Sequence, residues 1–162
     1  MTVVVSDTSP LNYLVLIDNV SVLPVLFGVV VVPSAVFREL QHAETPEKVR
    51  AWVSSHPSWL KVKTSTQADR IAGLGEGETE AIALAQELNA DLLLIDERKG
   101  TRAANAAGLK TAGTLAILDE ADRRGLLDFE AAIVRLQNTS FHVHPVLLES
   151  ILEQVRSRKS QN

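Results

Sequence analysis

Two short hydrophobic runs in the chain each lead into an aspartate. Residues 3–6 read Val-Val-Val-Ser and precede Asp7, and residues 92–95 read Leu-Leu-Leu-Ile and precede Asp96. Such runs are typical of buried parallel strands, and open α/β sheets bind their ligands outside the carboxyl ends of the strands. We therefore expect the two carboxylates to share one crevice.

Two glutamates are candidates for the same crevice. Glu78 precedes apolar residues by three, four and seven positions, so a helix would place it on the inward, apolar face. Glu39 falls late in a helix expected after the hydrophobic run 29–32. The other acids near Glu78 fall on different helical faces and are expected to be solvated: Glu76, Glu80 and Glu87.

Clustered carboxylates repel one another, and proteins commonly neutralise them with a hard cation such as Mg²⁺ or Mn²⁺. Such an ion activates water and stabilises charge on a phosphodiester. Each acid also has a structural explanation. Asp7 could belong to a turn, and Asp96 could cap the following helix. Glu78 could be a first-turn acid that the helix dipole favours, and Glu39 could be a surface glutamate.

The composition excludes several kinds of protein. The 162-residue chain contains no cysteine, which rules out disulfides and thiolate metal sites. A net charge of −4 and a pI of about 5.6 give no overall basic field, so a polyanion must be bound locally. Because the chain has neither a basic leader nor an apolar stretch of about 20 residues, we expect a cytoplasmic protein without a membrane span.

Strand and helix signals alternate, which predicts an α/β fold with a central parallel sheet. Strands are predicted at residues 2–6, 29–32 and 92–95. Helices are predicted at residues 10–18, with Ser9 as the cap, and at 34–40, 47–54, 77–88, 98–107, 114–125, 128–137 and 145–156. Residues 41–66 give no clear strand signal, and 110–112 is short for a strand. We expect one domain over residues 1–155 and a disordered basic tail over 156–162.

Four blocks of the sequence together resemble the PIN domain family, in its branch of nucleic-acid-binding and toxin-like proteins. They occur in the family's order within residues 2–125. The blocks are Val-Val-Ser-Asp-Thr-Ser-Pro-Leu at 4–11, Val-Pro-Ser-Ala-Val-Phe-Arg-Glu-Leu at 32–40, Gly-Glu-Gly-Glu-Thr-Glu-Ala-Ile-Ala-Leu-Ala at 75–85, and Leu-Leu-Leu-Ile-Asp-Glu-Arg-Lys-Gly at 92–100. Taken together, they are far more specific than any single block.

The resemblance implies a three-layer α/β/α sandwich with a Mg²⁺- or Mn²⁺-dependent endoribonuclease site. Asp7, Glu39, Glu78 and Asp96 fall at the family's acidic positions and would be catalytic. We expect Asp7, Glu78 and Asp96 to hold the metal. A further family aspartate, shortly after the fourth acid, has no match because residues 99–102 are Lys-Gly-Thr-Arg.

Residues expected to contact the substrate flank these acids. Thr8 and Ser9 match the family's small hydroxyl residue after the first acid. Arg98, Lys99 and Arg102 begin the helix after the fourth acid and could neutralise phosphates, although ordinary solvated helix charges explain them as well. The implied partners are single-stranded RNA and, for a toxin, an antitoxin protein. The apolar residues of 145–156 could form a homodimer surface or simply pack in the core.

The sequence is also compatible with other functions. An inactive PIN-like module that binds RNA or protein would explain the missing aspartate and the negative net charge. A phosphatase of the haloacid-dehalogenase type would need an aspartate where Ser9 stands. The glycines at 73–77 follow no clear strand, unlike a dinucleotide-binding loop. His142 and His144 are interpreted as surface or packing histidines rather than ligands.

Overall fold

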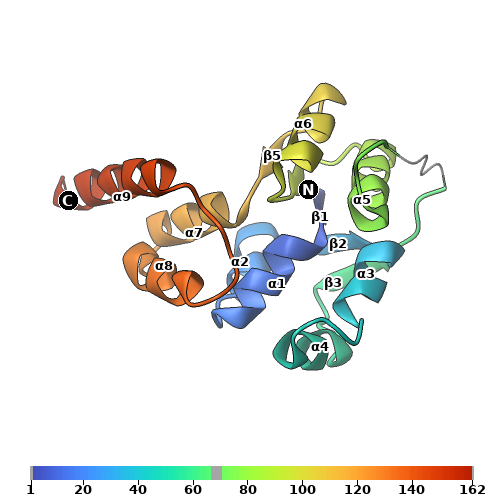
Figure 1. The fold of residues 1–162 in the computed structure, drawn as a ribbon, viewed down its shortest axis with the longest axis horizontal. Coiled ribbons are helices and arrows are strands. Elements are labelled where there is room, and N and C mark those ends of the chain that lie inside the picture. The colour runs from blue at the N-terminus through green and yellow to red at the C-terminus, as the bar shows by residue number, and fades with distance from the viewer. Residues whose placement is uncertain (1, 67–70, 162) are drawn as a thin grey trace.

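The computed structural model describes residues 2–66 and 71–161 of the chain. In this part of the chain, five strands form one parallel sheet in the order β3-β2-β1-β4-β5. The strands are β1 (Val4–Ser6), β2 (Val30–Pro33), β3 (Leu60–Lys63), β4 (Leu92–Leu94) and β5 (Thr111–Ala112). The helices, labelled in Figure 1, are α1 (Thr8–Leu16), α2 (Val22–Phe27), α3 (Ser34–Leu40), α4 (Glu47–Ser54), α5 (Glu76–Glu87), α6 (Arg98–Ala106), α7 (Thr114–Arg123), α8 (Phe129–Gln137) and α9 (Pro145–Ser160).

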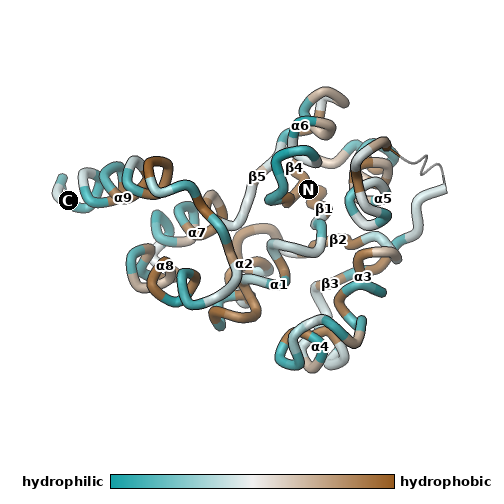
Figure 2. The backbone as a smooth tube through the Cα atoms, viewed as in Figure 1, coloured by the Kyte–Doolittle hydropathy of each residue, from teal (hydrophilic) through white to brown (hydrophobic). Residues whose placement is uncertain are grey.

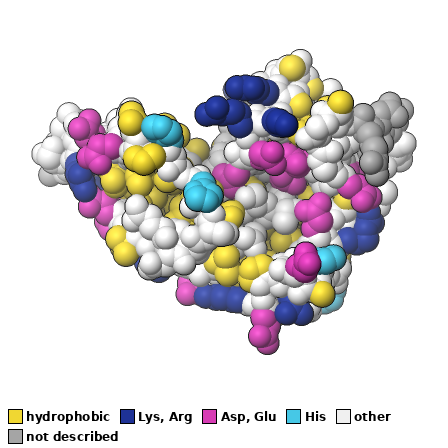
Figure 3. All heavy atoms as spheres, viewed as in Figure 1, with side chains coloured by type: hydrophobic (Ala, Val, Ile, Leu, Met, Phe, Trp, Pro, Cys, Tyr) yellow, Lys and Arg dark blue, Asp and Glu magenta, His cyan; other side chains and the backbone are white. Residues whose placement is uncertain are grey.

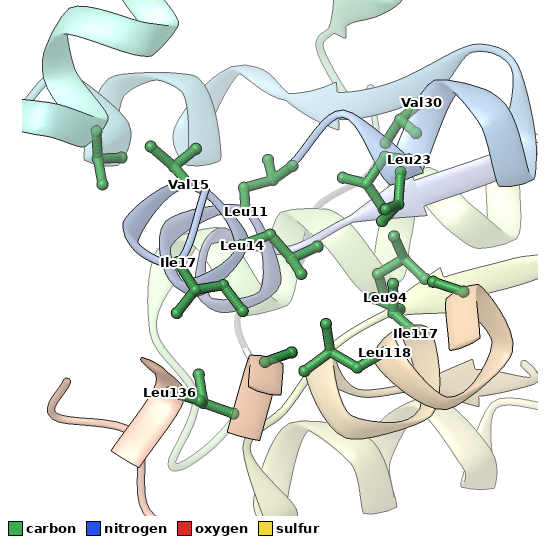
Figure 4. Packing of buried hydrophobic residues seen from close by; sticks show 14 of the residues in the cluster. Leu11, Leu14, Val15, Ile17, Leu23, Val30, Leu94, Ile117, Leu118 and Leu136 are labelled. Carbon is green, nitrogen blue, oxygen red and sulfur yellow. The ribbon is translucent and has the colours of Figure 1, made fainter. Parts of the chain in front are cut away.

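The two faces of the sheet bury alternate residues of each strand. Val4 and Leu94 belong to one hydrophobic cluster, and their neighbours Val5 and Leu93 belong to another. Successive strand side chains point to opposite faces, so continuous hydrophobic runs are covered on both sides. The first cluster includes residues of α1, α7 and α8 (Figure 4), and the second includes α5 and α6. The predicted three-layer α/β/α sandwich is therefore confirmed.

The apolar side chains concentrate where the layers meet. In Figure 2 brown stretches lie near β2 and β4 at the centre, whereas the helices carry both teal and brown stretches. Amphipathic helices that bury their apolar faces against the sheet produce this pattern. The sheet is thus enclosed, and polar chemistry is confined to its edges and strand ends.

The strand order creates a switch point in the middle of the sheet. The chain runs from β1 outward through β2 and β3, and then returns to place β4 on the other side of β1. Val5 pairs with Val31 on one side and with Leu93 on the other. In open α/β sheets, ligands bind outside the carboxyl ends of the strands at such a point. Asp7 and Asp96 both lie just beyond these strand ends.

The strand β3 was not predicted from the sequence. Within residues 2–66 and 71–161 it is an edge strand that pairs with β2 alone, and Leu60 is its one buried residue. The next three residues, Lys61, Val62 and Lys63, are exposed, so the segment lacks the hydrophobic run that marks the central strands. Lysines at an edge strand also discourage pairing with another chain.

The expectation of a disordered tail over residues 156–162 is wrong for residues 156–160, because α9 continues to Ser160. Arg156 pairs with Glu130 of α8, and Arg158 and Lys159 pair with acids of α7 and its following loop. These contacts with other elements stabilise the last turns of α9, and the apolar periodicity of the local sequence does not reveal them.

In the described part of the chain, no helix has both the length and the apolar character needed to cross a membrane.

Candidate active site

The predicted acids come together at the switch point of the sheet, each from a different element. Asp7 follows β1, Glu39 lies on α3, Glu78 lies on α5, and Asp96 follows β4. A cavity of about 300 Å³ is lined by the first three, together with Thr8, Ser9 and Glu97. Asp96 borders a larger cavity that adjoins it and is close enough to affect the pKa of Asp7.

Asp7 is the most buried of these acids, with 5% of its surface exposed. Burial raises the pKa of Asp7 to about 7, against the opposing effect of the Thr8 amide, and the negative charges of Glu78, Glu39 and Asp96 raise it further. Its own amide donates to the carbonyl of the last β4 residue at 2.8 Å, which ties the two central strands together at this point. The fold thus fixes a carboxylate where its charge is disfavoured.

The two carboxylate oxygens of Glu78 have different surroundings. Oε1 accepts a hydrogen bond from the Gly75 amide at 3.3 Å, whereas Oε2 is buried and has no hydrogen-bond partner among the described residues. Burial raises the pKa of Glu78, and the nearby carboxylates of Glu97 and Glu39 add to the effect. Oε2 lies so close to Gly100 that a Cβ there would approach it to 2.7 Å. Gly100 is therefore required for this placement of the side chain.

Asp96 is held by the start of α7. The Thr114 amide donates to Oδ1 and the Thr114 hydroxyl to Oδ2, both at 2.7 Å. Asp96 therefore binds the N-terminus of α7 and does not cap the helix that directly follows it, which was the structural alternative. Burial raises the pKa of Asp96, and the hydrogen bonds from Thr114 and Ser9 offset part of this. A Cβ on Gly113 would approach Oδ1 to 2.7 Å, so the carboxylate is closely confined.

Glu39 is exposed and is anchored by a neighbouring hydroxyl. Thr8 Oγ1 donates to Glu39 Oε2 at 2.6 Å, and the carboxylate lies against Gly77 of α5. Thr8 is the first residue of α1, so Asp7 occupies the cap position that the sequence assigned to Ser9. The earlier start places both hydroxyl residues in the first helical turn, beside the acids.

The sequence interpretation missed Glu97. It borders the same cavity as Asp7 and Glu78 and repels the Glu78 carboxylate. A signal was available, because Glu97 immediately follows an acid at a strand end. It provides a fifth carboxylate near the position where the family's further aspartate has no match.

Glu80 is a second difference from the prediction, which placed it in solvent. It is 7% exposed and accepts hydrogen bonds from Ser34 Oγ at 2.8 Å, the Ala35 amide at 3.2 Å and the Ser65 amide at 3.4 Å. Its carboxylate therefore caps the start of α3 and joins it to α5. These two helices carry Glu39 and Glu78, so Glu80 helps to position the site.

The basic residues predicted to contact substrate lie on the first turns of α6. Arg98 and Arg102 line the larger cavity, whereas Lys99 is exposed and lines none of the cavities described. In residues 2–66 and 71–161, none of the three forms an ion pair. They are therefore free to interact with an anionic ligand.

The donor set fits a hard divalent cation in kind. Carboxylate oxygens are the ligands that Mg²⁺ and Mn²⁺ prefer. Glu78 Oε2 is a buried oxygen without a hydrogen-bond partner among the described residues, so it is available as a metal ligand. Among the residues that the structure describes, however, no three Asp, Glu, His or Cys side chains are arranged to hold an ion as they stand. Binding at this site would thus require the side chains to move.

These features define a class of protein: a three-layer α/β/α domain with clustered carboxylates at the switch point of a parallel sheet. The model of the PIN domain family matches residues 3–157. The chain therefore belongs to the PIN domain family, whose members are generally metal-dependent nucleases.

A PilT N-terminus domain protein from the hyperthermophilic archaeon Sulfolobus solfataricus P2 has a similar solved structure, with 16% sequence identity and a TM-score of 0.47. The similarity covers 89% of this chain and 100% of the archaeal one. No curated protein matches the chain.

Proposed function

We propose that the chain is a Mg²⁺- or Mn²⁺-dependent endoribonuclease that hydrolyses RNA phosphodiester bonds at the carboxylate cavity. One observation carries this proposal: Asp7 is buried among acids whose charges are not balanced. In the described part of the chain, no Lys or Arg forms an ion pair with Asp7, Glu39, Glu78 or Asp96. A bound divalent cation would remove this repulsion.

The residues have distinct proposed roles. Asp7, Glu78 and Asp96 would hold the cation, and Glu97 is a further candidate ligand. When bound, the cation supplies Lewis acidity toward water and the scissile phosphate. Glu39 is more exposed and is anchored by Thr8, so it is suited to orient the attacking water.

The test is RNA cleavage by the wild-type chain and by Asp7→Asn and Asp96→Asn. We expect the wild type to cleave RNA with Mg²⁺ or Mn²⁺ and to stop when EDTA is added. Both variants should lose cleavage while their circular dichroism spectra stay native. Unchanged cleavage by both variants would contradict the proposal.

We further propose that the nuclease acts as the toxin of a toxin–antitoxin pair. The support is the resemblance of its blocks to toxin-like PIN proteins, and RNA cleavage by a toxin would arrest growth. We expect growth arrest when the wild-type chain is expressed and normal growth with Asp7→Asn. A small DNA-binding protein encoded beside it should restore growth, and normal growth with the active wild type would count against this role.

The alternative is a PIN-like module that binds RNA or a protein without cutting. The observation that favours it is that no three acids in residues 2–66 and 71–161 are arranged to hold a metal ion. This alternative predicts RNA binding that EDTA does not change, together with no cleavage at any Mn²⁺ concentration. Calorimetric titration with Mn²⁺ separates the two functions. A nuclease should bind Mn²⁺ in the wild type and lose this binding in Asp7→Asn, whereas a module that only binds RNA or protein should show no such difference.

A further inference from the structure

A second, larger cleft opens beside the carboxylate cavity. It has a volume of about 890 Å³ and shares Ser9, Tyr13 and Glu97 with the smaller cavity, so the two lie side by side. One wall comes from the start of α6 and α7. The other comes from residues 140–144 and from three residues of α9, namely Leu147, Ile151 and Gln154. In Figure 3 a hollow separates the Lys and Arg side chains over α6 from two His side chains on the opposite side.

The α6 wall carries positive charge without partners. Arg98 and Arg102 line the cleft, and neither forms an ion pair within the described part of the chain. The cations of α7 and α9 behave differently, because acids of the same region pair with Arg123, Arg124, Arg156, Arg158 and Lys159. Unpaired guanidinium groups beside a phosphodiester-cleaving site are suited to bind phosphates.

The opposite wall carries two imidazoles that the sequence interpretation set aside. His142 and His144 both line the cleft and are exposed. His144 Nδ1 accepts a hydrogen bond from the Val146 amide at 3.2 Å, which caps α9. When Nδ1 accepts, Nε2 carries the proton and is a donor. This wall therefore also offers hydrogen-bond donors to an anion.

An aromatic pair lies where the two cavities meet. The rings of Tyr13 and Phe141 are 4.9 Å apart and nearly perpendicular, and the Tyr13 hydroxyl is 3.0 Å from Ser140 Oγ. Tyr13 borders both cavities. An aromatic ring beside a phosphate-binding groove is suited to stack an unpaired base, which single-stranded RNA presents and a duplex does not.

We propose that this cleft binds single-stranded RNA, with Arg98 and Arg102 contacting phosphates from one wall, His142 and His144 from the other, and Tyr13 stacking a base next to the carboxylates. The proposal rests on the proposed nuclease function and extends it by defining the path of the substrate. A phosphate ligand would also explain why Arg98 and Arg102 have no ion-pair partner in the described part of the chain, whereas the cations of α9 do.

The first test measures binding without cleavage, using a fluorescein-labelled oligouridylate in EDTA and fluorescence anisotropy. We expect R98A/R102A to weaken binding about 10-fold or more and to reduce its salt dependence. The matched control is K61T/K63T, which removes two exposed charges from the edge strand β3, and it should change binding less than about twofold. Equal losses in the two double variants would overturn the proposal.

The second wall is tested with H142A/H144S, in which serine retains the capping acceptor at the start of α9. Binding should again weaken about 10-fold while the circular dichroism spectrum stays native. In Mn²⁺, both wall variants should raise KM with little change in kcat, which a structural defect would not do selectively. Native binding and native KM in H142A/H144S would overturn the role of this wall.

The path itself is tested by photo-crosslinking RNA that contains 5-iodouridine. The expected adduct is on the peptide that contains Tyr13 or the one that contains Phe141. If the wild type never cleaves RNA but the wall variants lose RNA binding, the result would support RNA binding in the cleft and refute the nuclease function. If both wall variants bind and cleave RNA normally and the crosslinks lie elsewhere, the result would refute RNA binding in the cleft and leave the nuclease function unaffected. It would then favour a protein ligand for this surface.

Discussion

Two aspartates with little-exposed side chains have opposite surroundings. Asp7, at the end of β1, faces other acids, and its pKa is raised to about 7, mainly by burial. The Asp122 side chain, on α7, is 4% exposed, but Arg158 contacts it at 2.9 Å and Lys159 at 2.9 Å. Burial raises the pKa of Asp122 as well, yet the hydrogen bonds from Lys159, the Phe129 amide and Arg158 outweigh it and hold that pKa below its ordinary value.

The comparison separates charge that stabilises the fold from charge that destabilises it. Around Asp122, carboxylates from α7 and its following loop meet cations from α9, and each negative charge has a positive partner. Around Asp7, the fold supplies no such partner among the described residues. A natural chain retains an unfavourable cluster when it serves a purpose, and here the purpose fits cation binding.

The largest expected effect contrasts two glutamates of α5 that lie in the same helical turn. Glu78→Gln should lower the rate of Mn²⁺-dependent RNA cleavage by roughly 10³-fold, because it removes a charge from the unbalanced cluster. Glu76→Gln should lower it less than about twofold, because Glu76 is exposed and pairs with Arg38 at 3.0 Å. Initial rates at saturating Mn²⁺ measure both, and similar losses would break the comparison.

The next effect concerns the stability of the metal-free chain. An unfolded Asp7 carboxyl titrates near 3.8 and the folded one at about 7, so between these values the folded state keeps a proton that the unfolded state releases. The stability contributed by protonated Asp7 is therefore present below pH 3.8 and is lost as the pH rises through about 7. Asp7→Asn lacks this titration and should be more stable than the wild type above that pH.

We expect the gain in Asp7→Asn to be of the order of 2–4 kcal/mol near pH 8 and to vanish near pH 4. Urea denaturation in EDTA at several pH values measures it. Saturating Mn²⁺ should reduce the difference, because the wild type then gains a bound cation. A variant less stable than the wild type at every pH would show that Asp7 has a compensating partner.

Asp122→Asn should act in the opposite direction. The lowered pKa of Asp122 means that its stabilising charge is present above the ordinary value of 3.8 and is lost as the pH falls through the lowered pKa. We expect a loss of about 1–3 kcal/mol near neutral pH, less than for a fully buried pair because Arg158 and Lys159 are partly exposed. Urea midpoints measure the loss, and RNA cleavage at permissive temperature should stay unchanged.

The smallest effect is expected for an exposed pair at the C-terminal end of α7. Arg124 Nε lies 3.0 Å from Glu120 Oε1, and both side chains are about half exposed. Arg124→Gln should cost at most about 0.5 kcal/mol, and added salt should abolish the difference. A larger loss would mean that charge pairing stabilises this region even at its surface, which would sharpen the contrast with the acidic cavity.

Much of the framework could be predicted locally. The central strands β1, β2 and β4 are buried on both faces, so their hydrophobic runs stand out in the sequence. The edge strand β3 exposes most of its residues and gave no such signal. The burial of Glu80 was also missed, because its partners Ser34 and Ala35 lie on another helix, 46 and 45 positions away.

The sequence by itself determined the alternation of strands and helices and the acids placed at the strand ends, because these depend on patterns within a few residues. Only the tertiary structure decided which charges are balanced. It brought Arg158 and Lys159 to Asp122 and left Asp7 among Glu39, Glu78 and Asp96. The energy of a buried charge depends on neighbours that arrive from distant parts of the chain, and no local pattern records which neighbours those are.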